Sequence, residues 1–141
     1  MEHEDLGALF AQITRRLIDA ERPLLAARGL SMWDYIVLSE LARRPAGTQL
    51  ALAEAIGYDK TRLIGLLDEL EHKGLITREP DPADRRARIV QLTPDGEARH
   101  AAARHDIHTM EDELLSKLSA AQQRTLRAVL PRLANPLDGV S

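Results

Sequence analysis

The segment from Gln49 to Gly96 restricts the fold more than any other part of the chain, because helix caps and glycines divide it into short elements. Thr48 is a suitable N-cap for a first helix, and Gly57 lies where a left-handed residue would end that helix. Apolar residues between them follow helical spacing: Leu50, Ala53 and Ile56. This spacing predicts a short helix that ends in a tight turn.

A second helix is predicted between Asp59, a suitable N-cap, and Gly74, which lies where the helix would end. Its packed face has apolar residues at i, i+3, i+4 and i+7: Leu63, Leu66, Leu67 and Leu70. The opposite face carries polar or small residues: Lys60, Thr61, Arg62, Gly65 and Asp68. Glu69 and Lys73 have the spacing of an i, i+4 ion pair, which would support the last turns.

A two-stranded hairpin is predicted directly after the second helix. Residues 75–79 are compatible with a strand, residues 80–83 form the turn region, and residues 86–92 return as the second strand. Arginines at or near the exposed tip are suited to bind phosphates or to enter a narrow minor groove: Arg85, Arg86 and Arg88. Asp84 lies beside them and is expected to orient an arginine through a charge-assisted hydrogen bond.

Two short helices joined by a tight turn and followed by a hairpin have the outline of a winged helix-turn-helix, a fold that reads duplex DNA. In such a fold the N-terminal part of the second helix enters the major groove. Lys60, Thr61 and Arg62 are therefore expected to meet phosphates and base edges. Gly65 has no side chain, so it would let the helix backbone approach DNA closely.

Residues 30–96 resemble the MarR family of bacterial transcriptional regulators. The resemblance rests on two motifs, the wing signature Asp84-x-Arg86 followed by Leu92-Thr93-x-x-Gly96, and the helix end Leu70-x-x-x-Gly74-Leu75. It implies a homodimer in which the terminal helices form the dimer and two winged lobes read adjacent major grooves of a palindromic operator. It also implies a repressor that is released by a small, often aromatic ligand.

The resemblance also implies roles for single residues. By position, Thr61 and Arg62 would read the major groove, and Arg86 would read the minor groove. Many members of the family carry a polar residue and an arginine where this chain has Ile64 and Gly65. We therefore expect Arg62 and the wing to carry more of the DNA contact in this chain.

The expected fold is mainly α with a small β-hairpin wing, in one subunit of three regions. Residues 1–30 would form an N-terminal dimerisation helix, residues 31–96 the winged helix-turn-helix DNA-binding region, and residues 97–141 the C-terminal dimerisation helices.

The first helix, about Glu4 to Leu25, has apolar residues near helical spacing: Leu6, Phe10, Ile13, Leu17 and Leu24. Packing of this helix within its own subunit is the alternative to dimerisation. Helix caps are expected at Thr93 and Ser119, and Pro136 and Gly139 should end the fold.

A further helix begins at Ser31, which forms a capping-box pattern with Asp34. Trp33 and Tyr35 on this helix have two interpretations, packing in the core or lining a ligand pocket. The resemblance implies a pocket between the dimer region and the DNA-binding lobe. Its candidate residues are Ile13, Leu17, Trp33, Tyr35, Ile36, His100 and Arg104, of which His100 and Arg104 would meet an anionic ligand at the pocket mouth.

His105, His108 and Asp112 share one helix face and have spacing that suits zinc or nickel with a ligand from elsewhere. A polar stripe facing solvent or the dimer partner is the favoured interpretation, because no further ligand cluster is visible. We expect neither a metal nor another cofactor.

The chain has no cysteine, which excludes disulfides and thiol redox sensing. It has no Gly-rich phosphate loop or nucleophile elbow, no signal peptide and no apolar run of membrane length, so we expect a cytoplasmic protein that is not an enzyme.

Charge alone does not predict DNA binding. The formal net charge is −3, and residues 59–88 contain seven basic and seven acidic residues. DNA binding therefore requires that the basic groups lie on the surface that faces the DNA groove, and that four acids lie away from this surface: Asp68, Glu69, Glu71 and Asp81. A winged-helix module that binds another protein is the alternative, and Ile64, Gly65 and the neutral charge balance favour it. Arg62 and the Asp84–Arg86 wing favour DNA.

Overall fold

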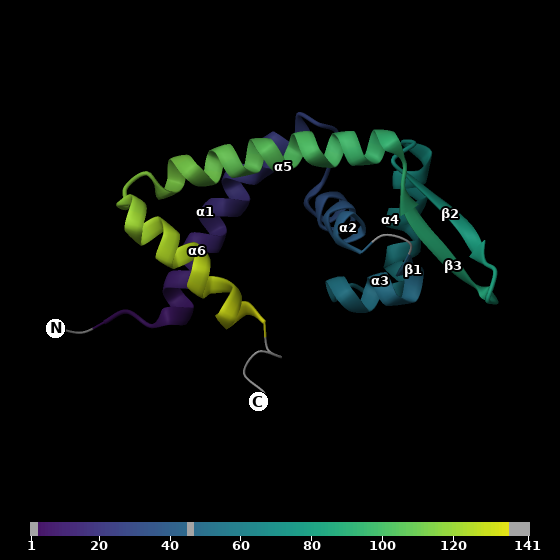
Figure 1. Ribbon diagram of the computed structural model, residues 1–141, viewed down its shortest axis with the longest axis horizontal. Helices are drawn as coiled ribbons and strands as arrows, with labels where there is room; N and C mark the ends of the chain where they lie inside the picture. The colour runs from purple at the N-terminus through teal and green to yellow at the C-terminus, as the bar shows by residue number, and fades with distance from the viewer. Residues whose placement is uncertain (1–2, 45–46, 136–141) are drawn as a thin grey trace. The chain divides into compact units, whose positions relative to one another are not determined.

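The computed structural model describes residues 3–44 and 47–135, which form helices and a small sheet (Figure 1). The helices are α1 (Leu6–Ala26), α2 (Met32–Arg43), α3 (Gln49–Ile56), α4 (Lys60–His72), α5 (Pro94–Leu115) and α6 (Ala120–Ala134). The strands are β1 (Gly47–Thr48), β2 (Ile76–Asp81) and β3 (Asp84–Leu92). The mainly α fold with a hairpin wing is confirmed, while the predicted chain end at Pro136 and Gly139 lies outside the described residues.

The chain divides into two compact units, residues 1–107 and residues 108–141, and the boundary falls inside α5. The second unit contains the end of α5 and the whole of α6. Ser119 and Gln122 form a capping box at the start of α6, and Ser119 is the cap that the sequence predicts. Arg127 of α6 pairs with Asp112 of α5 at 3.0 Å between Nη2 and Oδ1. Within the described residues, no helix is both long and apolar enough to cross a lipid bilayer.

The caps predicted for the two short helices are confirmed. The side-chain oxygen of Thr48 accepts a hydrogen bond from the Ala51 amide at 3.1 Å, and that of Asp59 accepts one from the Arg62 amide at 2.9 Å. Gly57 and Gly74 have φ values of +66° and +77°, which side chains rarely adopt. Thr48 and Asp59 thus begin α3 and α4, Gly57 sets the turn between the two helices, and Gly74 follows the end of α4.

The core of the first unit consists of aliphatic side chains from α2, α3, α4 and the sheet. Its fully buried members include Val37, Leu38, Leu52, Leu63, Leu67, Leu70, Leu75, Ile76 and Val90. The packed face predicted for α4 is thus confirmed. The prediction for Leu50 is wrong, because the packed face of α3 centres on Leu52 and Ala53, and Leu50 is 55% exposed.

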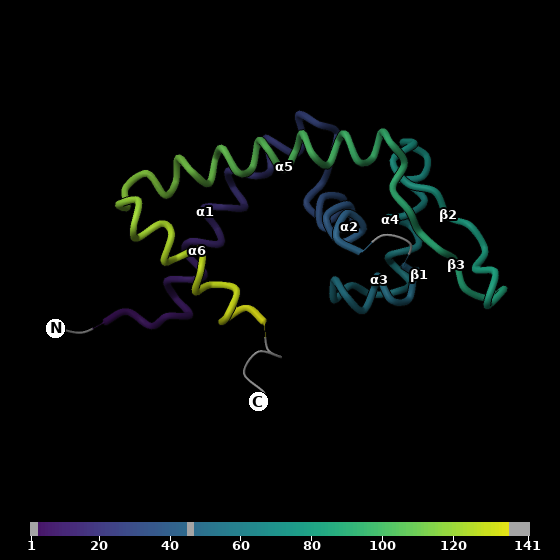
Figure 2. Tube along the Cα trace, viewed as in Figure 1, coloured from purple at the N-terminus to yellow at the C-terminus, as the bar shows by residue number. Residues whose placement is uncertain are grey.

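The three strands pair antiparallel in the order β1-β3-β2, so that β1 lies beside β3 in the chain trace of Figure 2. Thr48 pairs with Ile89, and Arg78 pairs with Val90. The predicted turn was too long: Pro80 and Asp81 belong to β2, and only Pro82 and Ala83 form the turn. Pro80 lies on the edge strand β2, next to an irregularity of the register between Pro80 and Asp81, and sheets tolerate proline at such places.

Thr93 and Gly96 join the sheet to α5. The Thr93 hydroxyl donates to the Gly74 carbonyl at 2.6 Å and accepts from the Gly96 amide at 3.0 Å, which confirms the predicted cap. Gly96 is buried against the backbone of Leu75, and a Cβ at this position would overlap the Leu75 carbonyl oxygen. The glycine of the Leu92-Thr93-x-x-Gly96 motif is therefore required by close backbone contact.

We expect Gly96→Ala to lower the free energy of unfolding by about 3 kcal/mol or more, the upper end of the usual range for overpacking, because both neighbours in the clash are backbone. Urea denaturation followed by circular dichroism measures this loss. Gly65→Ala is the matched control, since nothing lies within 4 Å of a Cβ added there. Equal stability of the two variants would contradict this account of Gly96.

Candidate nucleic-acid interface

A groove of about 600 Å³ lies between the N-terminal ends of α3 and α4 and the strand β3. Its lining residues come from three segments: Thr48, Gln49, Leu50, Lys60, Thr61, Ile64, Asp81, Asp84, Arg86, Ala87 and Arg88. Figure 1 shows the hairpin of β2 and β3 beside α4, so that one wall of the groove is helical and the other is a strand. The structure thus brings together five of the predicted DNA contacts, Lys60, Thr61, Asp84, Arg86 and Arg88.

Three predicted DNA contacts do not line this groove: Arg62, Gly65 and Arg85. All three are exposed, Arg62 and Gly65 on α4 and Arg85 on β3. The guanidinium carbon of Arg62 lies 5.3 Å from the centre of the Tyr58 ring, a cation–π geometry. The Tyr58 ring in turn packs on Trp33, with 4.4 Å between ring centroids. Trp33 is therefore not a core residue; it supports the turn between α3 and α4 from an exposed position.

The two carboxylates at the wing tip shape its backbone. Asp81 accepts a hydrogen bond from the Ala83 amide at 2.9 Å, and Asp84 accepts one from the Arg86 amide at 3.0 Å. Both are local turn contacts of the kind that Asp commonly makes. They correct two predictions: Asp81 lines the groove instead of lying away from it, and Asp84 binds the backbone of Arg86 rather than a guanidinium.

Arg78, a residue that the sequence interpretation missed, joins the wing to α4. Its side chain is only 15% exposed and forms ion pairs with Asp68 and, at 2.9 Å, with Glu71. The hydrogen bond from Arg78 holds the pKa of Glu71 below its usual range, and the bond to Glu71 raises the pKa of Arg78. The strand alternation that buries Ile76 also places Arg78 on the covered face of β2, a signal that was available in the sequence.

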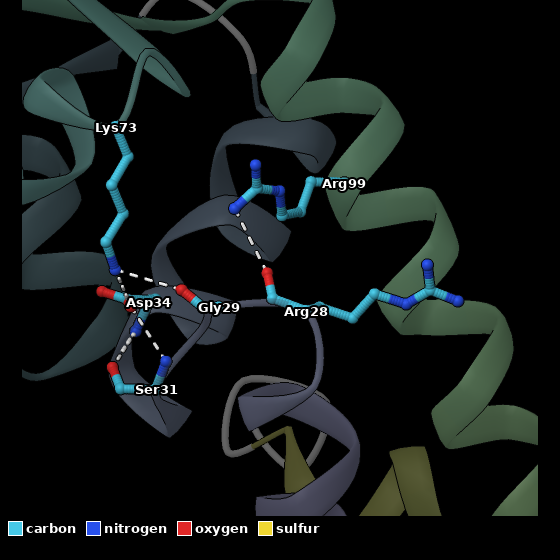
Figure 3. Close-up of polar contacts among 6 residues, drawn as sticks. All are labelled: Arg28, Gly29, Ser31, Asp34, Lys73 and Arg99. Atoms are coloured by element: carbon cyan, nitrogen blue, oxygen red, sulfur yellow. Dashed lines mark hydrogen bonds and ion pairs between the residues drawn. The ribbon is translucent and has the colours of Figure 1, made fainter.

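The other end of α4 is held by the polar contacts drawn in Figure 3. Lys73 donates to the Gly29 carbonyl at 3.1 Å and lies 3.4 Å from the Asp34 carboxylate. Asp34, only 3% exposed, also completes the predicted capping box with Ser31. The predicted pairing of Lys73 with Glu69 is therefore wrong: Lys73 follows the last residue of α4 and reaches the turn before α2 instead.

The same turn is also tied to α5. Arg28 pairs with Asp106 at 2.9 Å, and this hydrogen bond raises the pKa of Arg28 and lowers that of Asp106. Arg99 of α5 donates to the Arg28 carbonyl at 3.2 Å (Figure 3). The segment between α1 and α2 therefore contacts both the end of the second helix of the helix-turn-helix and the start of α5.

The residues proposed for a ligand pocket are only partly brought together. Tyr35 stacks on His100 with 5.4 Å between ring centroids, and the Nε2 atom of His100 lies 3.0 Å from the Ser39 hydroxyl. His100 lines a pocket of about 410 Å³ with Leu41, Ala42, Gln91, Leu92 and Glu97. Burial lowers the pKa of His100, and the charge of Arg104 lowers it further. Trp33 packs on Tyr58 instead, Ile13 and Arg104 are exposed, and Leu17 and Ile36 are half-buried.

Among the described residues, no three His, Asp or Glu side chains cluster as metal ligands would. Asp112, one of the three residues considered for a metal, is paired with Arg127 at 3.0 Å. His105 and His108 are exposed on α5. The described side chains thus supply no second cluster that would complete a metal site with these histidines.

We expect Lys73→Met to destabilise the fold by about 1 to 2 kcal/mol, because it leaves the buried Asp34 carboxylate with only the Ser31 amide as donor and Lys73 itself is partly exposed. Adding Asp34→Asn should recover part of the loss, since the unpaired charge is then removed. Urea denaturation of the single and double variants measures the coupling, with Lys117→Met as an exposed-lysine control. Strictly additive losses would contradict a direct interaction.

Comparison with known proteins identifies the family. Residues 28–87 match the sequence profile of the MarR family. Transcriptional regulator HosA of Escherichia coli O111:H- is 37% identical over 101 residues, which cover 72% of this chain and 75% of HosA.

Two solved structures extend the similarity to nearly the whole chain. The transcriptional repressor CouR, bound to a 23-mer DNA duplex, is similar with a TM-score of 0.83 and 27% identity, over 96% of this chain and 100% of that chain. CouR from Rhodococcus jostii RHA1 bound to p-coumaroyl-CoA has a TM-score of 0.78 and 27% identity, over 94% of each chain. The winged helix-turn-helix, the match to the family profile and the identity with HosA together show that the chain belongs to the MarR family of transcriptional regulators.

Proposed function

We propose that this protein is a homodimeric repressor that binds a palindromic operator and is released by a small ligand. The observation that carries the proposal is the groove in which Lys60 and Thr61 of α4 face Arg86 and Arg88 of β3. A helix N-terminus and a basic strand on two sides of one groove match the two parts of duplex DNA that a winged helix contacts, the major groove and the adjacent backbone or minor groove.

Each contact has a role in this proposal. Lys60 binds a phosphate, while Thr61 and Arg62 meet base edges and phosphates in the major groove. Arg86 enters the minor groove, and Arg85 and Arg88 bind flanking phosphates. Asp84 fixes the backbone of the wing tip through the Arg86 amide. The similarity to CouR bound to a DNA duplex supports this mode of binding.

Residues 1–30 and 97–141 are proposed to form the dimer, with residues 31–96 as the DNA-binding region. α1 exposes a row of large apolar side chains in the single chain: Leu6, Leu9, Phe10 and Ile13. α6 separately exposes Val129 and Leu133. Apolar rows of this kind on helices are usually covered by a partner, and a second copy of the chain is the partner that a two-fold symmetric operator requires.

Release by a ligand would follow from geometry. Two lobes must engage half-sites one helical turn apart, so a ligand that changes the distance between the two copies of α4 removes one lobe's contacts and the gain from binding both. The similarity to CouR bound to p-coumaroyl-CoA supports a small, aromatic-containing effector. Tyr35 and His100, which stack on each other, are the residues that we propose for contact with its ring.

A salt-resolved titration against the promoter DNA upstream of the protein's own gene, with a scrambled duplex as control, tests DNA reading. We expect tight, salt-dependent binding to the promoter alone. Arg86→Ala should weaken this binding by about tenfold or more, because it removes a charged contact at the wing. Arg43→Ala is the control, since Arg43 is exposed at the end of α2, outside the groove. Equal, weak binding to both duplexes would mean either that the operator lies elsewhere or that the alternative holds, a winged-helix module that binds another protein through its recognition surface.

Phe10→Asp should convert the dimer to a monomer and abolish tight binding to a two-site operator, because it buries a charge in the proposed interface. Analytical ultracentrifugation measures the mass of the particle, and circular dichroism checks that the helices persist. Ala8→Asp adds the same charge about half a turn away on α1 and should leave a dimer. A Phe10→Asp protein that remains dimeric would remove α1 from the interface.

A further inference from the structure

Two large apolar side chains are exposed inside the groove that we propose for DNA. Ile64 projects from α4 and is 48% exposed, and Leu50 projects from the first turn of α3. The two residues come from different helices of the helix-turn-helix but line the same groove as Lys60, Thr61 and Arg86. An exposed aliphatic residue is common on protein surfaces, but a pair that converges between basic groups requires an explanation.

Ile64 is not needed for the packing of α4. Leu63, Leu67 and Leu70 form the buried face of this helix, and each is at most 1% exposed. Ile64 points to the other side, where the residue that follows it is Gly65. Nothing lies within 4 Å of a Cβ added at Gly65, so no neighbour in the fold demands a glycine there. The side of α4 around Ile64 is therefore open to an external partner.

Duplex DNA presents a suitable apolar group at this place. In the major groove each A·T pair exposes the C5-methyl group of thymine, which aliphatic side chains recognise by contact. The branched side chain of Ile64 is short, so it reaches a base edge only if the helix backbone comes close to the DNA. Gly65, which adds no side chain beside it, permits that approach.

Resting on the proposed DNA binding, we infer that Ile64, assisted by Leu50, reads thymine methyl groups in each half-site of the operator. The charged groups around the groove position the duplex, while the two aliphatic side chains select A·T pairs in one orientation. Methyl contacts involve no counterion release, so they add sequence preference without changing the salt dependence of binding. Such reading suits a chain with a net charge of −3, in which the phosphate contribution is small.

The test uses a duplex that the full-length protein selects from a random-sequence library. Each thymine of one half-site is replaced singly by deoxyuridine, which removes only the methyl group. We expect at least one position to lose about three- to fivefold in affinity, the contribution of one buried methyl group. In Ile64→Ala the same replacement should have no effect, and Leu50→Ala should reduce the effect at the same or a neighbouring thymine. Arg43→Ala, an exposed residue outside both the groove and the proposed dimer helices, should keep the wild-type profile.

The outcomes separate the two proposals. Tight, sequence-specific binding with no deoxyuridine effect overturns the inference on Ile64 and leaves the DNA-binding function in place. A methyl effect that persists unchanged in both Ile64→Ala and Leu50→Ala also overturns it, because other residues then read the methyl. Failure to select any duplex overturns the proposed function itself. Circular dichroism and urea denaturation of the variants confirm that these exposed substitutions leave the fold intact.

Discussion

The ion pairs of Arg78 with Asp68 and Glu71 hold the wing against α4, and the groove depends on them. The pairing of β1 with β3 and the burial of Ile76 and Val90 fix the base of the hairpin, and Arg78 adds a direct tie between the hairpin and α4. Arg78 is mostly buried, whereas Asp68 and Glu71 are 60% and 42% exposed, so these pairs direct the wing more than they stabilise the fold. The hairpin and α4 therefore present their basic groups to one ligand at a fixed separation.

A second set of polar contacts holds the far end of α4. Lys73 bonds to the turn between α1 and α2, and Arg28 and Arg99 connect that turn to α5. Apolar packing alone leaves a helix some freedom to slide and rotate, whereas directed hydrogen bonds at both ends define its position. A ligand that moves the turn before α2 would therefore move α4 with it, which is the coupling that the proposed release mechanism requires.

The placement of charges, rather than their sum, explains how a chain with excess negative charge can form a DNA-binding surface. Arg78 is shared between Asp68 and Glu71 and offsets one of their two negative charges, and the carboxylates of Asp81 and Asp84 accept hydrogen bonds from backbone amides of the wing tip. Lys60, Arg86 and Arg88 line the groove together with Asp81 and Asp84, whereas Asp68 and Glu71 lie outside its lining. The balanced count along residues 59–88 therefore does not describe the groove, whose lining holds three basic side chains against two acidic ones.

Local signals in the sequence determined the elements: the caps Thr48, Asp59 and Thr93, the glycines Gly57 and Gly74, and the apolar row of α4 predict their structures correctly, because each acts over a few residues. The winged helix-turn-helix outline indicated which residues would face DNA, and the resemblance to a known family added the individual roles of Thr61, Arg62 and Arg86. Only the tertiary structure decided the partners of Lys73 and Arg78, the exposure of Leu50 and Trp33, and the place of Asp81 in the groove. These depend on contacts between segments far apart in the chain, for which hydrophobic periodicity and pair spacing carry no information.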